Sequence, residues 1–575
     1  MEQRIDLMSR TAFARRPAVS RAAIALTLAT IAVSVASTSD AQTTPVGPAR
    51  PDRQQPREIE PPPPRAAPQG ALVTVEIPGE WQIRLWGQPE LSLPTTPGAS
   101  SPQTLGQTYY LEQWFRLRPV FRLGDWLSVF ANFDLTRAIL VGESTRHVEL
   151  SRDARSTALT PFTHGIFDLR QLAVELKTRL GVLRAGHQLS HWGLGIVANS
   201  GDLRPVFGDY RNGDIVERVA FATRPGGRQS PWVVALAGDL VFRDRLASLL
   251  AYDVSVDRGD PPFASTIIEQ PPTRTVGGDW AWQGIVSAYY QAPECTRECE
   301  RKRVGMYAVY RSQTNREGDS LMAGFVDASA RWEWPSPDGR ATVFAAAELA
   351  LAVGHTTIAR SVAQPDGHAV VQHGGAIQLG VERAGSMRLV LEGGWASGDS
   401  NPADNVQRRF TFNPAHRVGL IMFPEVLAWH TARSASISND PRLMGTGARG
   451  AILLPSSGAV TNAAYIYPTA IVDVTRWLDL RAGAVVGVST SDLVDPVRST
   501  IYGRSLNYRG GDARAKDLGL ELDVGIDGHH VLPGNIKLHW GLQGAGFFAG
   551  HAFDNEFGES LPARWLGVVR VGLEY

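Results

Sequence analysis

The sequence has little cysteine and little charge of either sign. It holds two cysteines among 575 residues, too few for a disulfide scaffold or a four-cysteine metal site. Charged residues make up 20% of the chain, below the share of about 25% that is usual in soluble domains. The 57 basic and 57 acidic residues cancel. No global field therefore exists to attract nucleic acid, and a nucleic-acid partner is not expected.

Long apolar runs are also scarce, and the run near the N-terminus is too short to span a membrane. Residues 22–36 are 15 residues without a charge, and they follow a segment with five arginines. A membrane-spanning helix needs about 20 apolar residues, so this run is typical of a secretory signal peptide rather than of an anchor. The small residues Ser39 and Ala41 indicate cleavage after Ala41, which makes 1–41 the signal peptide.

Glycine, proline and tryptophan are abundant, with 57, 37 and 15 residues respectively. This composition is typical of a long β-protein with many turns. Segment 42–71 is rich in proline and has almost no large apolar side chain, so it cannot bury a core. We expect it to be a disordered periplasmic linker.

From residue 72 onward, apolar and polar residues alternate with a period of two, which is typical of strands with one apolar and one polar face. Many of these strands run ten to fifteen residues. Strands in soluble sheets average about five or six residues, whereas about 9 to 11 cross a bilayer at a tilt. Short turns alternate with long stretches such as 398–458, which we interpret as a polar loop.

The alternation predicts eighteen strands, within a range of 16 to 20. They lie near 80–91, 108–123, 126–140, 165–177, 181–190, 214–224, 231–240, 281–291, 303–313, 321–334, 340–353, 371–383, 387–397, 459–474, 479–490, 516–528, 535–549 and 562–575. Segment 241–257 is a further candidate hairpin. Pro119 removes a ladder hydrogen bond inside a strand, so we expect a bulge there.

Tryptophans gather near the expected strand ends, as at a membrane interface. Beside the short turns stand Trp126, Trp232, Trp332, Trp334 and Trp477, and near the opposite ends stand Trp192, Trp280, Trp282 and Trp395. The alternative is a soluble sandwich whose tryptophans belong to its core.

The signal peptide, the hairpin rhythm over 72–575 and the terminal WLGVVRVGLEY resemble Gram-negative outer-membrane β-barrels of the porin and alginate-export-like type. The resemblance implies an all-β fold, a transmembrane antiparallel up-and-down barrel with short periplasmic turns and long extracellular loops. It also implies a place in the cell outer membrane, contact with outer-membrane lipid, and recognition by the barrel-assembly machinery. The assembly signal would comprise Trp565, Val569, Val571, Leu573 and Tyr575.

Polar side chains that face the lumen are the functional candidates, because a charge on the lipid face at midplane costs about 2 to 4 kcal/mol. By strand parity they are Glu112, Arg116, Arg118, Arg122, Asp134, Asp327, Arg331, Glu348, Glu382, Arg388, Glu392, Arg481, Glu521, Asp523, Lys537, His539 and Arg570. Arg116, Arg118 and Arg122 form a basic strip, and Glu521 with Asp523 an acidic one. Opposed strips would sort solutes by charge; alternatively, these charges only pair and hydrate the interior.

The expected function is a porin-like channel for passive diffusion of small hydrophilic solutes, without enzymatic activity. The alternative is a structural or adhesive surface barrel whose extracellular loops bind partners and close the lumen. The pattern leaves the solute and the oligomeric state open.

No cofactor is expected, although one loop offers oxygen ligands for calcium from Asp399, Asn401, Asp404 and Asn405. The same residue types are ordinary in turns. Cys295 and Cys299 are expected to form a disulfide across a periplasmic turn, because the compartment is oxidising and the spacing allows the approach.

Overall fold

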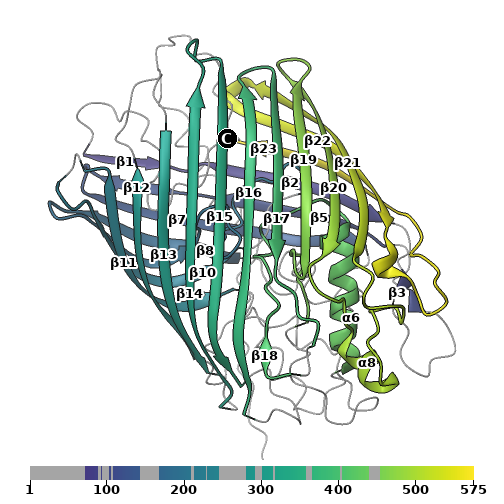
Figure 1. Cartoon of the computed structure of the whole chain (residues 1–575). Coiled ribbons are helices and arrows are strands. Elements are labelled where there is room, and N and C mark those ends of the chain that lie inside the picture. Colours follow the sequence, from purple (N-terminus) through teal and green to yellow (C-terminus); the bar gives the residue numbers. More distant parts are fainter. Residues whose placement is uncertain are drawn as a thin grey trace, which may run out of the picture. The chain divides into compact units, whose positions relative to one another are not determined.

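A computed structural model describes residues 72–88, 92–93, 103–104, 108–142, 167–208, 213–227, 230–244, 280–291, 301–314, 318–357, 366–401, 404–438 and 454–575. Most of their strands form one closed antiparallel β-barrel, drawn in Figure 1, and β3 (Ser92–Leu93) pairs with β4 (Gln103–Thr104) in a separate two-stranded sheet. The expected signal peptide 1–41 and linker 42–71 lie outside the described residues, as does most of the candidate hairpin 241–257.

Eighteen of the described strands make the wall, and each overlaps one of the predicted strands. They are β2 (Gly79–Gln88), β5 (Thr108–Leu117), β7 (Leu127–Gly142), β8 (Phe167–Lys177), β9 (Val182–Leu189), β10 (Ile215–Thr223), β11 (Trp232–Arg243), β12 (Trp280–Gln291), β13 (Arg301–Thr314), β14 (Ser320–Pro335), β15 (Ala341–Thr356), β16 (His368–Arg383), β17 (Met387–Ala396), β19 (Ala463–Asp473), β20 (Leu478–Ser489), β21 (Asp517–Leu532), β22 (Ile536–Ala549) and β23 (Arg564–Glu574). Each pairs with its neighbour in the chain, as a period of two with short turns requires.

The barrel closes between its first and last wall strands. β23 pairs antiparallel with β2, from Glu80 opposite Glu574 to Gly87 opposite Gly567. At the end of this seam the backbones of Gly79 and Tyr575 exchange two N–H···O bonds of 3.0 and 3.2 Å. A Cβ on Gly79 would stand 2.4 Å from the Tyr575 ring, so a larger residue at this position would displace the Tyr575 side chain.

The proposed assembly residues share the outer face of the closing strand. Trp565 is 58% exposed, Val569, Val571 and Tyr575 are also exposed, and Leu573 is half-buried between them. Recognition of this face by the assembly machinery stays a prediction.

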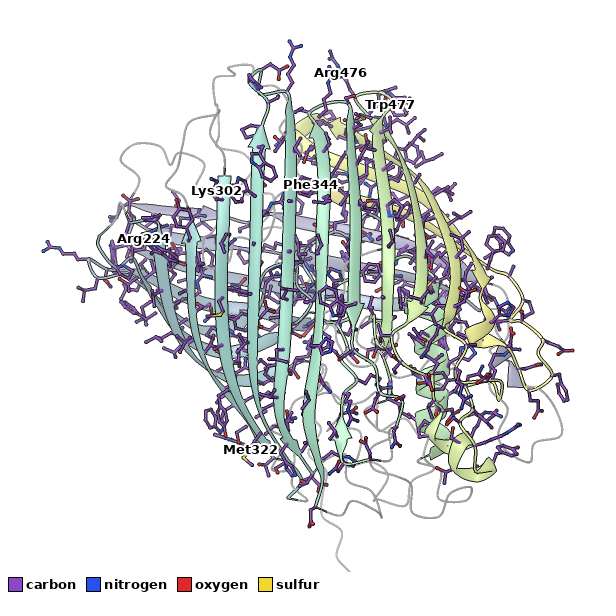
Figure 2. The ribbon with its side chains drawn as sticks, in the orientation of Figure 1. Arg224, Lys302, Met322, Phe344, Arg476 and Trp477 are labelled. Carbon is purple, nitrogen blue, oxygen red and sulfur yellow. The ribbon has the colours of Figure 1, made fainter. Side chains whose placement is uncertain are left out.

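Most short and long connections lie at opposite ends of the barrel, as predicted; the exception is the five-residue connection 315–319 between β13 and β14, which lies at the long-loop end. The turns Gly124–Trp126, 178–181, 336–340 and 384–386 lie at the end where the C-terminus lies, and Figure 2 shows Arg476 and Trp477 of the β19–β20 turn there. The connections at the other end include 190–214, 397–462 and 490–516. In outer-membrane barrels the short turns face the periplasm and the long loops the exterior.

Pro119 interrupts pairing without the predicted bulge. Strand β6 (Val120–Leu123) continues β5 beyond Arg118 and Pro119, and β1 (Val73–Glu76) precedes β2 across Ile77 and Pro78. The flanking pairs Leu117–Phe133 and Val120–Phe130 keep one register. The bulge prediction is therefore wrong, because proline removes one N–H donor here without inserting a residue. The register shifts of this strand pair lie nearer 111–115.

The outer face of the wall is largely apolar. Exposed side chains there include Leu236, Val286, Val326, Leu349 and Val524. The tryptophans predicted beside the turns are exposed, as are Trp280 and Trp282, whereas Trp395 is half-buried. No helix among the described residues is long and apolar enough to cross a membrane.

Trp192 is an exception to the tryptophan prediction. It is only 8% exposed, lies inside the barrel, and donates from Nε1 to Asp327 Oδ1 at 3.0 Å. Placing it at the membrane interface was wrong, because the segment that follows β9 turns inward instead of continuing along the wall.

Candidate functional site

Two loops from the long-loop end fold into the lumen. Inner loop 1 is residues 190–208, between β9 and β10. Inner loop 2 is residues 404–438, between β17 and β19, and contains β18 (Val406–Gln407), the π-helix η2 (Met422–Leu427) and helix α6 (Ala428–Ser438). Helix α6 lies at the end opposite the C-terminus (Figure 1).

Inner loop 2 corrects the interpretation of 398–458 as a polar loop. Its residues Phe412, Leu420 and Phe423 are fully buried in an apolar cluster with wall residues such as Val485 and Phe547. The apolar run 418–429 (VGLIMFPEVLAW) was the available signal. Because an apolar run is unfavourable in water, inside the lumen it packs against the wall and forms the core of a plug.

Glu348 on β15 holds inner loop 1. Its carboxylate accepts from three consecutive backbone N–H groups, of Leu194, of Gly195 at 2.8 Å and of Ile196 at 3.2 Å. The preceding Gly193 has φ +57°, and a Cβ there would stand 2.6 Å from Glu348 Oε2. Glycine therefore lets the backbone turn its donors onto the buried carboxylate.

Glu521 on β21 holds inner loop 2 in the same way. Its carboxylate accepts from the backbone N–H groups of Leu420, of Ile421 at 2.8 Å and of Met422 at 2.6 Å. Gly419 precedes them with φ +66°, and a Cβ there would stand 2.7 Å from Oε1. Two glutamates predicted to line an open pore are thus fully buried anchors for the inner loops.

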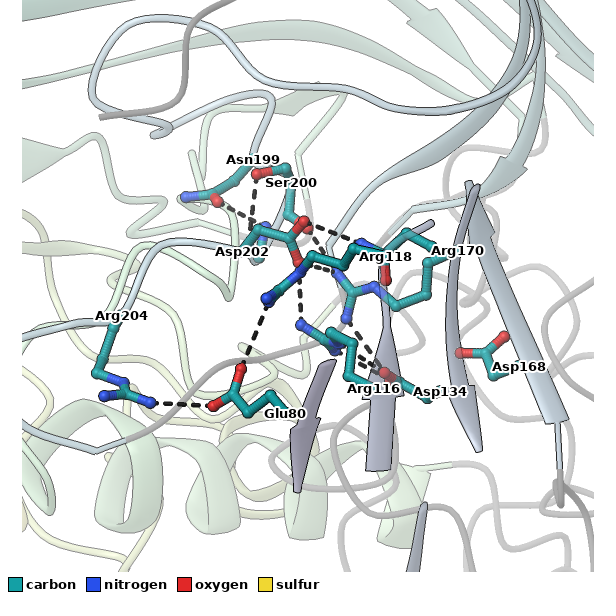
Figure 3. A network of polar contacts seen from close by, with 12 residues as sticks. Glu80, Arg116, Arg118, Asp134, Asp168, Arg170, Asn199, Ser200, Asp202 and Arg204 are labelled. Atoms are coloured by element: carbon teal, nitrogen blue, oxygen red, sulfur yellow. Dashed lines mark hydrogen bonds and ion pairs between the residues drawn. The ribbon is translucent and has the colours of Figure 1, made fainter. Parts of the chain in front are cut away.

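A network of charges docks inner loop 1 onto β5, β7 and β8 (Figure 3). Arg116 donates to both carboxylate oxygens of Asp134, at 2.6 and 3.0 Å, and to Asp202 at 3.1 Å. Arg170 donates to Asp202 at 2.7 Å, and Arg204 of the same loop donates to Glu80 at 3.0 Å. Inner loop 1 thereby places Asp202 against the wall arginines Arg116 and Arg170, and Arg204 against the wall carboxylate of Glu80.

Each arginine of the predicted basic strip has an acidic partner. Arg116 is fully buried, Arg118 lies 3.5 Å from Glu80, and Arg122 lies 3.0 Å from Glu76. The acidic strip on β21 lies four strand pairings from β5 around the wall, through β22, β23 and β2. In a wall of eighteen strands the opposite position is nine pairings away, so the prediction that the two strips oppose each other across the lumen is wrong.

The other predicted lumen residues also face inward, and each is buried or half-buried. Glu112 pairs with Arg84, Asp327 binds Trp192, Arg331 binds Glu333, Glu392 binds Tyr465, Arg481 and Arg570 pair with Asp527, and Lys537 and His539 pair with Glu574; Glu382, Arg388 and Asp523 complete the set. Strand parity placed them correctly, and a role in lining a pore stays a prediction.

Two charged residues inside the barrel, Arg84 and Asp202, were not predicted. Arg84 stands between Ile83 and Leu85, so the same parity could have found it. Asp202 offers no local signal, because its partners Arg116 and Arg170 lie 86 and 32 positions away in the sequence.

His416 of inner loop 2 joins both loops to the wall. Its Nδ1 lies 3.0 Å from the Leu194 carbonyl oxygen, and its Nε2 lies 3.1 Å from Glu392 Oε1. The Leu194 carbonyl and the ionised Glu392 carboxylate are both acceptors, so the imidazolium form, which donates from both ring nitrogens, satisfies both contacts. Burial opposes this charge, but the Glu392 carboxylate outweighs it and raises the pKa of His416 above its ordinary value.

We expect this contact to weaken as pH rises. A raised folded-state pKa means that the stabilisation is complete below the ordinary value of about 6.5 and is lost as pH rises through the folded pKa. Ion conductance across the barrel should therefore increase on the alkaline side of that window. His416→Gln should remove this step and His539→Gln, at the other end of the lumen, should preserve it; a pH profile shared by all three proteins would contradict the role of His416.

The predicted calcium loop has ordinary turn contacts. Asp399 accepts from the backbone N–H of Asn401 at 3.0 Å and of Arg408 at 3.1 Å, and Asp404 accepts from Val406 N–H at 2.9 Å. No cluster of three metal-binding side chains occurs in the described part of the chain, and calcium binding by this loop stays a prediction. Cys295 and Cys299 lie outside the described residues.

A closed, even-stranded antiparallel barrel with an apolar outer face, a charged interior and long loops at one end defines an outer-membrane β-barrel. The chain therefore has its place in the cell outer membrane, as predicted.

No protein-family model matches the sequence, and no curated protein matches it. Among solved structures the chain is similar to the outer membrane protein OpdK from Pseudomonas aeruginosa, at 10% identity over 87% of this chain and 99% of that chain, with a TM-score of 0.41. It is also similar to P. aeruginosa OpdK with vanillate (12% identity, 87% and 98% covered, TM-score 0.44). Acinetobacter baumannii OccAB2 gives 10% identity, 87% and 98% covered, and a TM-score of 0.43.

Proposed function

We propose that the protein is an outer-membrane channel through which small hydrophilic solutes diffuse passively, along a lumen narrowed by its two inner loops. Solutes would pass through the lumen without being chemically changed, so the protein would not be an enzyme. The observation that carries this proposal is a cavity of about 190 Å³ that remains between inner loop 2 and strands β10–β16. Glutamine, arginine and aspartate side chains take part in its lining.

Polar wall residues extend from this side of the lumen toward the short-turn end. Arg303 lies over the ring of Tyr289 at 5.2 Å, and Arg331 lies over the ring of Phe344 at 4.5 Å. Both arginines are partly exposed, which supports a hydrated path through this half of the barrel.

The alternative, a structural or adhesive barrel with a closed lumen, is favoured by one observation. Inner loop 2 forms an apolar core with the opposite wall, in which Phe412, Met422 and Trp429 are fully buried. Such a plug narrows the lumen whichever function is correct.

Recording from purified protein in planar bilayers distinguishes the two functions. The channel proposal predicts discrete conductance steps in potassium chloride, small for an eighteen-stranded barrel because of the inner loops. Folded protein, identified by heat-modifiable migration on gels, that inserts and gives no steps would contradict the channel and favour the closed barrel.

A further inference from the structure

The cavity beside inner loop 2 has a defined position in the lumen. It is bounded by residues 407–413 of inner loop 2, by Ser190, Val197 and Ala198 of inner loop 1, and by inward-facing residues of β10 and β12–β16 near the ends of these strands toward the long loops. The apolar plug of inner loop 2 packs largely against the remaining wall, on β17–β23, β2 and β5. A solute that passes the plug on its polar side would enter this cavity.

Five amide side chains belong to the polar lining of the cavity. They are Gln283, Gln313, Gln372, Gln407 and Asn413. Among the described residues Gln372 has no side-chain hydrogen-bond partner, and Gln407 uses its Oε1, which accepts from the Arg409 backbone N–H at 3.3 Å. Gln283 donates to Asp239, Gln313 Oε1 accepts from Arg311, and Asn413 donates to Asp214. The Gln372 amide can therefore offer a ligand both a donor and an acceptor, and the Gln407 amide can offer its donors, which matches the two roles of a hydroxyl group.

Aromatic rings supply part of the apolar lining, beside aliphatic side chains such as Ile285 and Leu321. Tyr307 and Phe325 from the wall and Phe410 and Phe412 from inner loop 2 line the cavity. Flat apolar faces beside hydrogen-bonding groups suit a ligand with C–H faces and a hydroxyl rim, since apolar lining with a few polar groups is the usual design of small-molecule sites.

The charged groups of the cavity are bound to protein partners. Arg311 donates to both carboxylate oxygens of Asp244, and Arg409 is hydrogen-bonded to the Tyr508 side chain. Asp214 accepts from the Asn413 amide at 2.7 Å. Burial and the nearby Asp244 carboxylate raise the pKa of Asp214 above its ordinary value.

We propose that this cavity is a binding site for a neutral, hydroxyl-rich solute such as a sugar or polyol. The proposal rests on the channel function and specifies its solute class. The volume of about 190 Å³ lies below the roughly 300 to 1,000 Å³ of sites for drug-sized ligands, which limits the ligand to a small molecule. Because Arg311 and Asp244 neutralise each other, ionic attraction from this pair would contribute little to binding.

Titration calorimetry of the purified protein in detergent tests the proposal, because it measures binding whether or not ions pass. Glucose should give saturable heat, and gluconate, with similar hydroxyl groups but a carboxylate, should bind more weakly. Gln372→Leu and Gln407→Leu each remove an amide at similar volume. Either should weaken glucose binding roughly 2- to 10-fold, the loss of about one hydrogen bond.

Gln82→Leu is the matched control, because Gln82 is a buried lumen glutamine outside this cavity. Its glucose affinity should equal that of the unmodified protein. Absence of saturable glucose binding, gluconate binding as tight as glucose, or equal loss in Gln82→Leu would overturn the proposal. Silence in planar bilayers alongside intact glucose binding would instead count against the channel function and leave the binding site standing.

Discussion

Replacing Glu348 and Glu521 together with alanine should raise the ion conductance of the barrel several-fold. Each carboxylate is the acceptor for three consecutive N–H groups of an inner loop. A buried donor left without an acceptor costs about 1 to 3 kcal/mol, and each 1.4 kcal/mol changes the docked-to-undocked ratio about tenfold. The loops should therefore spend much of their time away from the wall, where water can satisfy their backbone groups.

Planar-bilayer recording measures this effect, and each single variant should give an intermediate conductance. Glu175→Ala is the matched control, because Glu175 is a buried lumen glutamate whose carboxylate accepts from Arg184 of the adjacent strand at 3.0 Å instead of from a loop. Heat-modifiable migration on gels separates variants that open from variants that fail to fold. Unchanged conductance in a folded double variant would show that the two carboxylates do not hold the loops in place.

Arg116→Ala should destabilise the barrel by about 3 to 5 kcal/mol, because removing one member of a buried ion pair leaves the other uncompensated. Arg116 is 0% exposed and binds Asp134 through two parallel N–H···O bonds, with Asp202 as a further partner. The loss should appear as a lower denaturant midpoint in detergent. Arg116→Lys should recover only part of it, because an ammonium group cannot reproduce the planar fork of the guanidinium.

The double variant Arg116→Ala with Asp134→Ala distinguishes pairing from packing. Without either charge the site holds no uncompensated Asp134 carboxylate, so the double variant should be more stable than Arg116→Ala alone. Arg122→Ala provides the control for an exposed pair, since its partner Glu76 is about half exposed, and it should cost roughly 0 to 1 kcal/mol. Additive losses in the double variant would contradict a coupled buried pair.

The strands of the barrel wall could be predicted from the sequence, because strand faces and the pairing of neighbouring strands depend on residues close together in the chain. A period of two fixes which side chains share a face, and a short turn fixes that neighbouring strands pair. Residues such as Asp134, Glu348 and Arg570 could therefore be placed inside the barrel before any contact was known. Their inward position follows from their strand neighbours alone.

The positions of the two inner loops in the lumen could not be predicted from local sequence patterns, because they depend on contacts between distant parts of the chain. The Glu348 carboxylate meets Gly195 across 153 positions of sequence, and the Glu521 carboxylate meets Ile421 across 100. The two carboxylates can accept from the loop backbones only after the wall has closed. Neither the loop sequences nor the residues next to the glutamates therefore predict the contact. Trp192 shows the same limit, because its partner Asp327 is 135 positions away. Local sequence patterns specify the strands and their faces, whereas the contacts between buried carboxylates and loop backbones, and the cavity beside them, arise only when the wall closes.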